Sequence, residues 1–316
     1  MKNEKTPAGF QLRHTLKANN RAVTRLAWSP NDQTLASASY DQTVRLWDTE
    51  SGTQIRELYG YSGSVFTVAI TPDGRYAISA SKNSLKVWDL TGETRARTLR
   101  GHTDYIYAVA VTPDGRYAVS GAYDEKLKVW DLATDEARFT LGGHSGRISS
   151  VIVAPDNRTV ISGAADGQLK LWDLVEGREQ TTLLGHKAEV LSLALASDGR
   201  LLASASHGHD IRLWDIATGE LLHVLAAHNK PVTAVSFAGN DLFLASKSAD
   251  NTVRLWRRLG PEITAAWETV AVLVEPHSTF AFAGLAFHPQ RPVLATLGDK
   301  DRVIRIWDLD FTVWIS

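Results

Sequence analysis

The sequence predicts an all-β fold made of seven similar four-stranded antiparallel sheets, and three observations predict it. First, a segment of the type RLWD or KVWD recurs, with tryptophan at positions 47, 88, 130, 172, 214, 256 and 307. These positions are 41 or 42 residues apart, except for the last interval of 51. Second, the stretch TPDGRYA occurs at Thr71 and again at Thr112, one period later. A fixed period of this length indicates a repeat architecture.

The third observation is the order of the elements within each unit. A nearly all-apolar run such as IYAVAV comes first, as expected for a strand buried on both faces. A turn signal such as PDGR follows, and then a run of small and apolar residues such as YAVSGA. The third strand alternates, as in LKVWD, and the fourth is more polar, as in TRARTLRG. This gradient predicts sheets arranged radially around an apolar axis, which is a β-propeller.

The composition excludes several classes of protein. Lys and Arg number 34 and Asp and Glu number 35, and this balance disfavours nucleic acid as the main partner. The absence of cysteine excludes a disulfide and a cysteine-based metal site, and it fits a reducing compartment, so we expect a cytoplasmic protein. No apolar run approaches the roughly 18–20 residues of a membrane span. We expect no cofactor, no bound metal, no small-molecule substrate and no membrane contact.

The repeats also carry the marks of a known family. The dipeptide Gly-His occurs at residues 101–102, 143–144 and 185–186, and each of these histidines precedes its tryptophan by 28 residues. With the Trp-Asp ends, these features make the chain resemble the WD-repeat family over nearly its whole length. The regularity of the repeats is similar to that of bacterial, especially cyanobacterial, WD-repeat proteins. In those proteins the propeller is often the sensor or docking domain of a larger regulatory chain.

Closure of the ring needs one more strand, because seven third strands are separated by only six fourth strands. The resemblance implies that Phe10–Ala18 pairs with the strand that ends at Trp307. The tail Leu309–Ser316 is a rival for this place, but it lacks the strand spacing of the other units. We therefore expect a flexible segment at residues 1–9, the propeller at 10–308 and a tail at 309–316. An apolar tail is also what a domain cut from a longer chain would have.

A recurring set of His, Ser, Asp and Trp residues could be misread as catalytic triads. The resemblance instead implies a buried hydrogen-bonded chain inside each blade, which satisfies polar groups and fixes the geometry of the blade. Because the set recurs in several units, we expect a structural role, no catalytic residue and no enzyme activity. The complete sets are His102, Ser120, Asp124 and Trp130; His144, Ser162, Asp166 and Trp172; and His228, Ser246, Asp250 and Trp256.

Four units depart from this set. Asn19 and Tyr61 stand where units one and two should have histidine, and unit two is one residue short and lacks its Asp. Unit five has Gly208 at the Asp position. Unit seven keeps Asp301, and His277 could serve it at a changed spacing. The loss of single members fits a distributed support better than an active site.

A basic residue lies two positions before every one of the seven tryptophans. Seven basic residues could suggest a phosphate-binding ring. The strand period of two instead places each one beside its own Trp, where the stem packs and the charged group finds an acid or water. They are Arg45, Lys86, Lys128, Lys170, Arg212, Arg254 and Arg305.

Specificity should lie where the units differ. In the family, the loops that join fourth to first strands and second to third strands line one rim, where partners dock. Tyr and Arg dominate interface hot spots, so units one to three, which are rich in aromatic residues, predict a docking site for a protein or peptide. The alternative is that some of these rings pack between blades. The rim positions carried over from the family are Tyr40, Phe66, Tyr105, Tyr107, Tyr123, Arg147, Glu189 and His207.

Two segments and two further functions stay open. HGHD at His207–Asp210 is half of a possible metal site, but an ordinary exposed turn is the favoured interpretation. The insertion Arg257–Ser278 is either a second contact surface or a lengthened outer strand. As alternatives to the docking platform, an enzyme propeller would need acids or metal ligands in the central channel, and a nucleic-acid or ubiquitin-binding module would use the rim.

Overall fold

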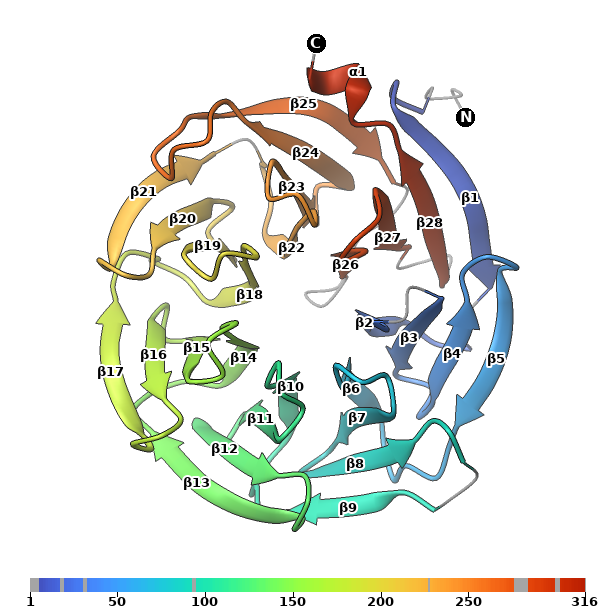
Figure 1. Cartoon of the computed structure of the whole chain (residues 1–316), viewed down its shortest axis with the longest axis vertical. Helices are drawn as coiled ribbons and strands as arrows, with labels where there is room; N and C mark the ends of the chain where they lie inside the picture. Colours follow the sequence, from blue (N-terminus) through green and yellow to red (C-terminus); the bar gives the residue numbers. More distant parts are fainter. Residues whose placement is uncertain are drawn as a thin grey trace.

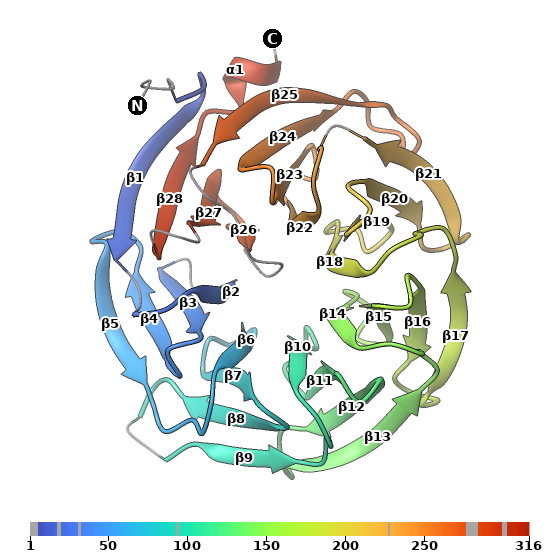
Figure 2. The same ribbon diagram turned by 180° about the vertical axis from the view of Figure 1, so that it is seen from behind.

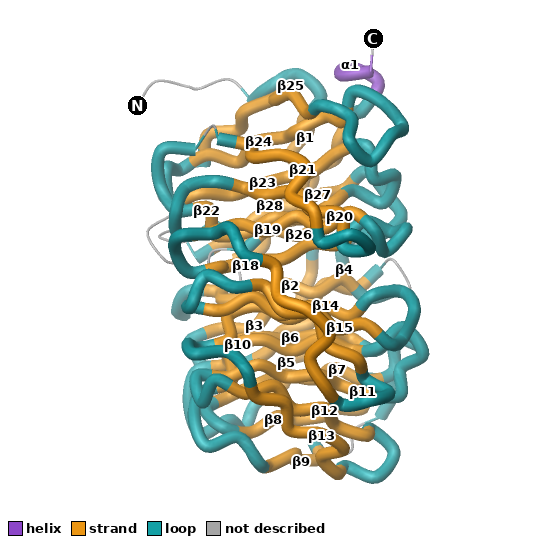
Figure 3. The backbone as a smooth tube through the Cα atoms, turned by 90° about the vertical axis from the view of Figure 1, so that its left-hand side faces the viewer, coloured by secondary structure: helices purple, strands orange, loops and turns teal. Residues whose placement is uncertain are grey.

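The computed structural model describes residues 6–17, 20–30, 33–92, 95–226, 228–275, 284–298 and 302–315. Seven four-stranded antiparallel sheets surround a central axis, as predicted (Figure 1). The first strand of each blade faces the axis and the last lies on the circumference, and the view from behind shows the same order (Figure 2). Edge-on, the molecule is a disc with loops on two opposite faces (Figure 3).

The strands follow the period of the sequence, blade by blade. Blades 1 and 2 contain β2 (Val23–Trp28), β3 (Thr34–Ser39), β4 (Val44–Asp48), β5 (Thr53–Leu58), β6 (Val65–Ile70), β7 (Tyr76–Ser81), β8 (Ser84–Asp89) and β9 (Arg97–Arg100). Blades 3 and 4 contain β10 (Ile106–Val111), β11 (Tyr117–Ala122), β12 (Lys126–Asp131), β13 (Glu136–Gly142), β14 (Ile148–Val153), β15 (Thr159–Ala164), β16 (Leu169–Asp173) and β17 (Arg178–Leu183). Blades 5 and 6 contain β18 (Val190–Leu195), β19 (Leu201–Ser206), β20 (Ile211–Asp215), β21 (Glu220–Leu225), β22 (Val232–Phe237), β23 (Phe243–Ser248), β24 (Thr252–Arg258) and β25 (Trp267–Val274). Blade 7 contains β26 (Leu285–Phe287), β27 (Val293–Leu297), β28 (Val303–Leu309) and β1 (Phe10–Lys17).

Burial explains why each strand has its composition. Every residue of β11, β19 and β23 is buried, since the second strand packs against neighbouring blades on both faces. The outer strand β13 buries only Leu141 of its seven residues, and its other side chains are exposed or half-buried. The small residues of the second strands therefore fill the narrow space between blades, and the polar outer strands face water.

The N-terminal strand closes the ring. β1 pairs antiparallel with β28, from Phe10 opposite Leu309 to Lys17 opposite Val303, and Arg13 makes an ion pair with Asp308 at 2.5 Å. The prediction that the N-terminal segment closes blade 7 is therefore confirmed, although Ala18 lies outside the described residues. Closure leaves no sheet edge at the joint and fixes the two ends of the chain side by side.

The C-terminal tail does not form the strand that closes the ring, which was the rival prediction for that place. It forms one helical turn, α1 (Thr312–Ile315), whose Trp314 is buried. The indole packs edge-on against Phe10 and Phe243, with ring centroids 5.5 and 6.2 Å apart. The described part of the chain contains no helix that could cross a membrane.

The insertion after Trp256 lengthens the outer hairpin of blade 6. β24 and β25 pair out to Arg258 opposite Trp267, and β25 has eight residues. The Trp267 ring lies 6.1 Å from that of Phe237. The lengthened-strand interpretation is correct for this part. Residues 276–278 of the insertion lie outside the described residues.

Ring closure predicts that β1 contributes strongly to stability through its buried side only. Leu16 is 2% exposed, so Leu16→Ala should lower the free energy of unfolding by about 2–5 kcal/mol through the cavity it leaves. Leu12 in the same strand is 46% exposed, and Leu12→Ala should change it by about 0.5 kcal/mol or less. Urea unfolding of both variants checks this, and equal effects would show that β1 does not hold the ring closed.

Candidate interaction surface

The hydrogen-bonded chain implied by the resemblance is present in blades 3, 4 and 6. In blade 3, His102 lies 2.8 Å from both Asp124 Oδ2 and Ser120 Oγ, and the indole N–H of Trp130 donates to Ser120 Oγ at 2.8 Å. The equivalent distances in blades 4 and 6 lie between 2.8 and 2.9 Å. The Ser and His side chains are buried inside each blade, which is the setting of a structural support and not of a catalytic cleft.

Burial is the main influence on the pKa values of the groups in this hydrogen-bonded network. It lowers the pKa of His102, His144 and His228, because the charged imidazolium loses its water, and the neighbouring carboxylate offsets only part of this effect. Burial alone would raise the pKa of Asp124, because it disfavours the charged carboxylate. Hydrogen bonds from the backbone N–H of Thr103, from His102 and from the backbone N–H of Lys126 outweigh it and lower the pKa of the carboxyl. Each pair is therefore most stable as a neutral imidazole beside a carboxylate.

Blade 5 corrects one prediction. Gly208 does not leave this blade without its acid, because Asp210, two residues later, occupies the site beside His186 at 3.5 Å. Ser206 Oγ and Arg212 Nε donate to its two carboxylate oxygens at 2.7 and 2.8 Å. Arg212, which lies two positions before Trp214, thus helps to hold Asp210 beside His186. An Asp two residues after the expected position was the missed signal.

In two other blades, the described residues bonded to the tryptophan and to its hydroxyl partner are of other kinds. In blade 2 the Tyr61 hydroxyl takes the place of the imidazole, at 2.5 Å from Ser79 Oγ and 2.7 Å from the Trp88 indole nitrogen. In blade 7 the Trp307 indole donates to Thr296 Oγ1 at 3.0 Å, and Thr296 donates to Glu275. Glu275 also pairs with the buried Lys247 at 2.5 Å. The predicted members Asn19, His277 and Asp301 lie outside the described residues.

The basic residues before the tryptophans mostly meet acids or hydroxyls of their own blades. Lys170 Nζ lies 2.8 Å from Glu179, Arg45 Nε lies 3.2 Å from Glu57, and Lys128 donates to Thr140 Oγ1 at 2.7 Å. These three basic residues therefore have local partners, as the structural interpretation expects.

The structure joins five aromatic side chains of the predicted docking rim into one patch, here called the aromatic surface. Phe66 lies at its centre, with ring centroids 5.7 Å from Tyr40, 5.6 Å from Tyr105 and 5.0 Å from Tyr107. Tyr107 in turn lies 6.4 Å from Tyr123. These rings come from blades 1, 2 and 3, so they do pack across blade boundaries. Tyr105 and Tyr123 nevertheless remain 43% and 49% exposed.

A polar pair continues the aromatic surface into blades 4 and 5. The Arg147 guanidinium lies 5.7 Å from the Tyr107 ring centroid and binds both Glu189 oxygens at 2.8 Å. The hydrogen bonds with Glu189 raise the pKa of Arg147. His207 is exposed, and its backbone N–H donates to the Glu189 carbonyl at 2.8 Å. The eight predicted rim residues therefore form a continuous arc.

The central channel has a different character from the rim. Arg25 of β2 reaches from blade 1 to blade 4 and donates to the Ser149 carbonyl at 3.4 Å. It borders a cavity of 170 Å³ between first strands, in which it is the only charged residue among the described ones. Among the described residues, no group of three or more His, Asp or Glu side chains could hold a metal. This lining offers no acid or base for the alternative of a channel enzyme.

Comparison with known proteins establishes the family. Seven stretches match the WD40 family profile, described as WD domain, G-beta repeat, at residues 10–48, 52–89, 93–131, 136–173, 177–215, 219–257 and 267–308. The chain belongs to the WD-repeat family. Each stretch ends at or just after one of the seven tryptophans, as the period predicts.

The relatives of this WD-repeat protein match it only in part. Small ribosomal subunit protein RACK1 of Drosophila melanogaster is 40% identical over 79 residues, covering 23% of this chain and 25% of the relative. Ribosome assembly protein 4 of Chaetomium thermophilum is 37% identical over 73 residues, covering 23% and 14%. F-box-like/WD repeat-containing protein TBL1X of Mus musculus is 55% identical over 42 residues, covering 13% and 8%. These relatives are eukaryotic, and the resemblance to bacterial proteins stays a prediction.

The hydrogen bonds of Asp124 predict a loss of stability when its carboxylate is removed. Asp124→Ala leaves the His102 ring and the Thr103 N–H without their acceptor, which should cost about 1–3 kcal/mol of unfolding free energy. Glu136→Ala, which removes an exposed acid from the same blade, should change it by about 0.5 kcal/mol or less. Chemical denaturation measures both, and an unchanged Asp124→Ala protein would contradict a supporting role.

The lowered histidine pKa values predict an acid-labile fold. In the unfolded chain these histidines bind protons near their ordinary value of 6.5, whereas the folded ones bind them only at lower pH. Stability is therefore complete above pH of about 6.5 and falls below it, by at most about 1.4 kcal/mol per pH unit for each histidine. Thermal unfolding between pH 7.5 and 5.5 tests this. His207→Asn, at an exposed site, should leave the slope unchanged, and a melting temperature that rises with acid would refute the prediction.

Proposed function

We propose that this WD-repeat protein is a non-enzymatic interaction platform that docks a protein or peptide on the rim carrying the aromatic surface. The single observation that supports it most is the continuous contact of rings from Tyr40 to Tyr123, with Tyr105 and Tyr123 about half exposed. Tyrosines of this kind bury much area on binding and retain a hydroxyl for hydrogen bonding.

The aromatic surface is also preorganised. Phe66 is held between Tyr40 on one side and Tyr105 and Tyr107 on the other, so its position is fixed before any partner arrives. Arg147 is fixed over Tyr107 by its two bonds to Glu189. Side chains that are already ordered lose little conformational entropy on binding, which favours affinity.

Three further proposals rest on the sequence alone. We place the protein in the cytoplasm because it lacks cysteine. We propose that residues 10–308 form one propeller domain followed by a tail at 309–316; the flexible segment expected at 1–9 lies in part, at residues 1–5, outside the described residues. We also propose that it serves as the docking or sensor domain of a larger regulatory protein, on its resemblance to cyanobacterial WD-repeat proteins. The near-zero net charge supports a protein partner over nucleic acid.

The aromatic surface predicts the loss of partner capture when its exposed rings are removed. Tyr105→Ala combined with Tyr123→Ala should abolish capture of partners from native lysate, because both rings lie at the exposed part of the surface. The measurement is a pull-down with wild-type and variant bait, scored by mass spectrometry for proteins that wild type enriches.

A matched control separates this effect from a general loss of exposed apolar area. Val175 and Val224 are 57% and 48% exposed on blades 4 and 5, away from the aromatic surface. The variant Val175→Ala with Val224→Ala should capture the same proteins as wild type. Undiminished capture by the double tyrosine variant, with an unchanged melting temperature, would refute the proposed docking site. Capture that disappears at moderate salt would instead favour nucleic acid as the ligand.

A further inference from the structure

Blade 2 lacks the cover that the other blades give to their tryptophan. Its outer strand β9 has four residues, and its pairing with β8 ends at Arg97 opposite Val87, so Trp88 has no partner residue in this strand. In blade 3, by contrast, the outer strand continues past the tryptophan, and Trp130 pairs with Ala137. Trp88 is accordingly 9% exposed, against 1% for Trp130.

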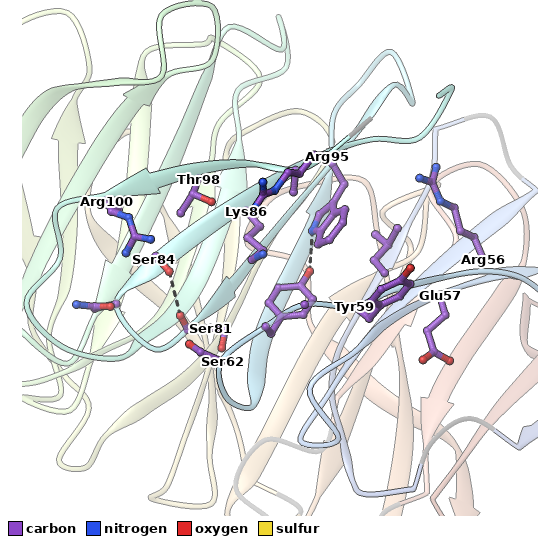
Figure 4. A pocket seen from close by; sticks show the side chains of 16 residues that line it. Arg56, Glu57, Tyr59, Ser62, Ser81, Ser84, Lys86, Arg95, Thr98 and Arg100 are labelled. Carbon is purple, nitrogen blue, oxygen red and sulfur yellow. Dashed lines mark hydrogen bonds between the residues drawn. The ribbon is translucent and has the colours of Figure 1, made fainter. Parts of the chain in front are cut away.

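This missing cover leaves a cavity of 770 Å³ between blades 1 and 2. One wall comes from β8, from β9 and from the residues just before β9, and it carries Lys86, Arg95 and Arg100 (Figure 4). The opposite wall comes from the end of β5 and the residues after it, and includes Glu57 and Tyr59 (Figure 4). Tyr59 is 74% exposed, so its ring lies free at the mouth.

The cations of this cavity lack the acids found in other blades. Lys170 and Arg212 bind acids at 2.8 Å, but Lys86 Nζ lies only over the rings of Tyr61 and Trp88, at 5.4 and 5.3 Å. Blade 2 has no Asp after β7, because the turn is one residue short.

Among the residues that the structure describes, the other charged groups at the cavity do not neutralise these cations. Of the described residues that line it, Glu57 is the only acid, and Arg45 already binds it at 3.2 Å. Arg56 adds a fourth cation, which donates to the backbone carbonyls of Asp89 and Gly92. Burial lowers the pKa of Lys86, and the charges of Arg95 and Arg100 lower it further, which shows that like charges meet here.

We propose that this cavity binds the phosphate of a phosphorylated side chain in a peptide partner. Arg95, Arg100 and Lys86 supply the positive charge and the N–H donors that a phosphate dianion takes up in charge-assisted hydrogen bonds. The hydroxyls of Ser84 and Thr98 lie on the same wall and supply neutral donors (Figure 4). A carboxylate has two oxygens and one charge, whereas a phosphate monoester offers three oxygens and nearly two charges, so the cluster favours phosphate.

The position of the cavity favours a peptide over a nucleic acid or a membrane. Lys86, Arg95 and Arg100 all belong to blade 2 of a chain whose net charge is -1, whereas those larger ligands need an extended basic surface. Ser62 lines this cavity, and the next residue, Gly63, lines a smaller cavity of 280 Å³ together with Phe66, Tyr105 and Tyr107. The inference thus deepens the proposed function, on which it rests, since one peptide can contact the aromatic surface and place its phosphate here.

The test uses degenerate peptide arrays with a central phosphoserine, phosphotyrosine, unmodified residue or glutamate, followed by fluorescence anisotropy on the best binder. Wild type should bind the phosphorylated form roughly tenfold or more tightly than the unmodified and glutamate forms, since each lost charged hydrogen bond is worth at least that much. Lys86→Met with Arg100→Gln should abolish this preference while keeping the stems that pack on Trp88. Lys187→Met with Arg178→Gln removes the same charge from blades 4 and 5 and should behave as wild type.

Every outcome decides the proposal. Equal binding of phosphorylated and glutamate peptides, no binder on the array, or a preference that survives Lys86→Met with Arg100→Gln would overturn it. Should that variant unfold, Arg95→Gln with Arg100→Gln, both at exposed positions, replaces it.

The double variant Tyr105→Ala with Tyr123→Ala separates the two proposals. If it binds the phosphopeptide like wild type, the cavity is supported and the aromatic docking site fails. If phosphorylation of the peptide does not change its binding but the two tyrosines are needed, the aromatic docking site is supported and the phosphate site fails.

Discussion

A buried indole N–H in every blade is the constraint on which the rest of the structure depends. The tryptophan of each third strand fills the space beneath the outer strand, and its nitrogen lies where water does not reach. An unpaired donor in that place would cost the blade more than most single contacts contribute. Each blade therefore supplies a hydroxyl from its second strand, at 2.8 to 3.3 Å: Trp47 with Ser37, Trp88 with Ser79, Trp130 with Ser120, Trp172 with Ser162, Trp214 with Ser204, Trp256 with Ser246 and Trp307 with Thr296.

Beyond this bond, the groups that satisfy the hydroxyl are interchangeable. Histidine does so in blades 3, 4, 5 and 6, a tyrosine hydroxyl in blade 2, and Glu275 with the buried Lys247 in blade 7. The common requirement is that each buried polar group finds a partner, and several chemistries meet it. Burying the Lys247–Glu275 pair also carries a desolvation cost that a His–Asp pair, with a neutral imidazole, largely avoids.

The sequence predicted the features that depend on period and failed where a contact depends on the path of a turn. The number of blades and the strand order follow from spacing and pattern, which are local properties, whereas the closure by Phe10–Ala18 was implied by the family resemblance. Asp210 was missed because an acid at a later position in a turn of the same length can reach the same histidine, and a fixed offset cannot represent that. Glu275 was missed because Thr296 and Lys247 come from different strands. The proximity of the aromatic rings was anticipated from their rim positions, but the exposure of each ring depends on how neighbouring blades pack.

The same reasoning connects the departures in blade 2 with its surface. Replacing histidine by Tyr61 removes the need for an aspartate. The Tyr61 hydroxyl can donate one hydrogen bond and accept another, and Ser79 and the Trp88 indole supply both partners. Once the aspartate is not needed, the turn after β7 can shorten, and Lys86 contacts the rings of Tyr61 and Trp88 where Lys170 and Arg212 contact acids. A short outer strand then leaves the cation open to solvent beside Arg95 and Arg100. A change that is neutral for the support of the blade thus creates an unbalanced charge at its edge, and unbalanced charge in a concave site is what selects an anionic partner.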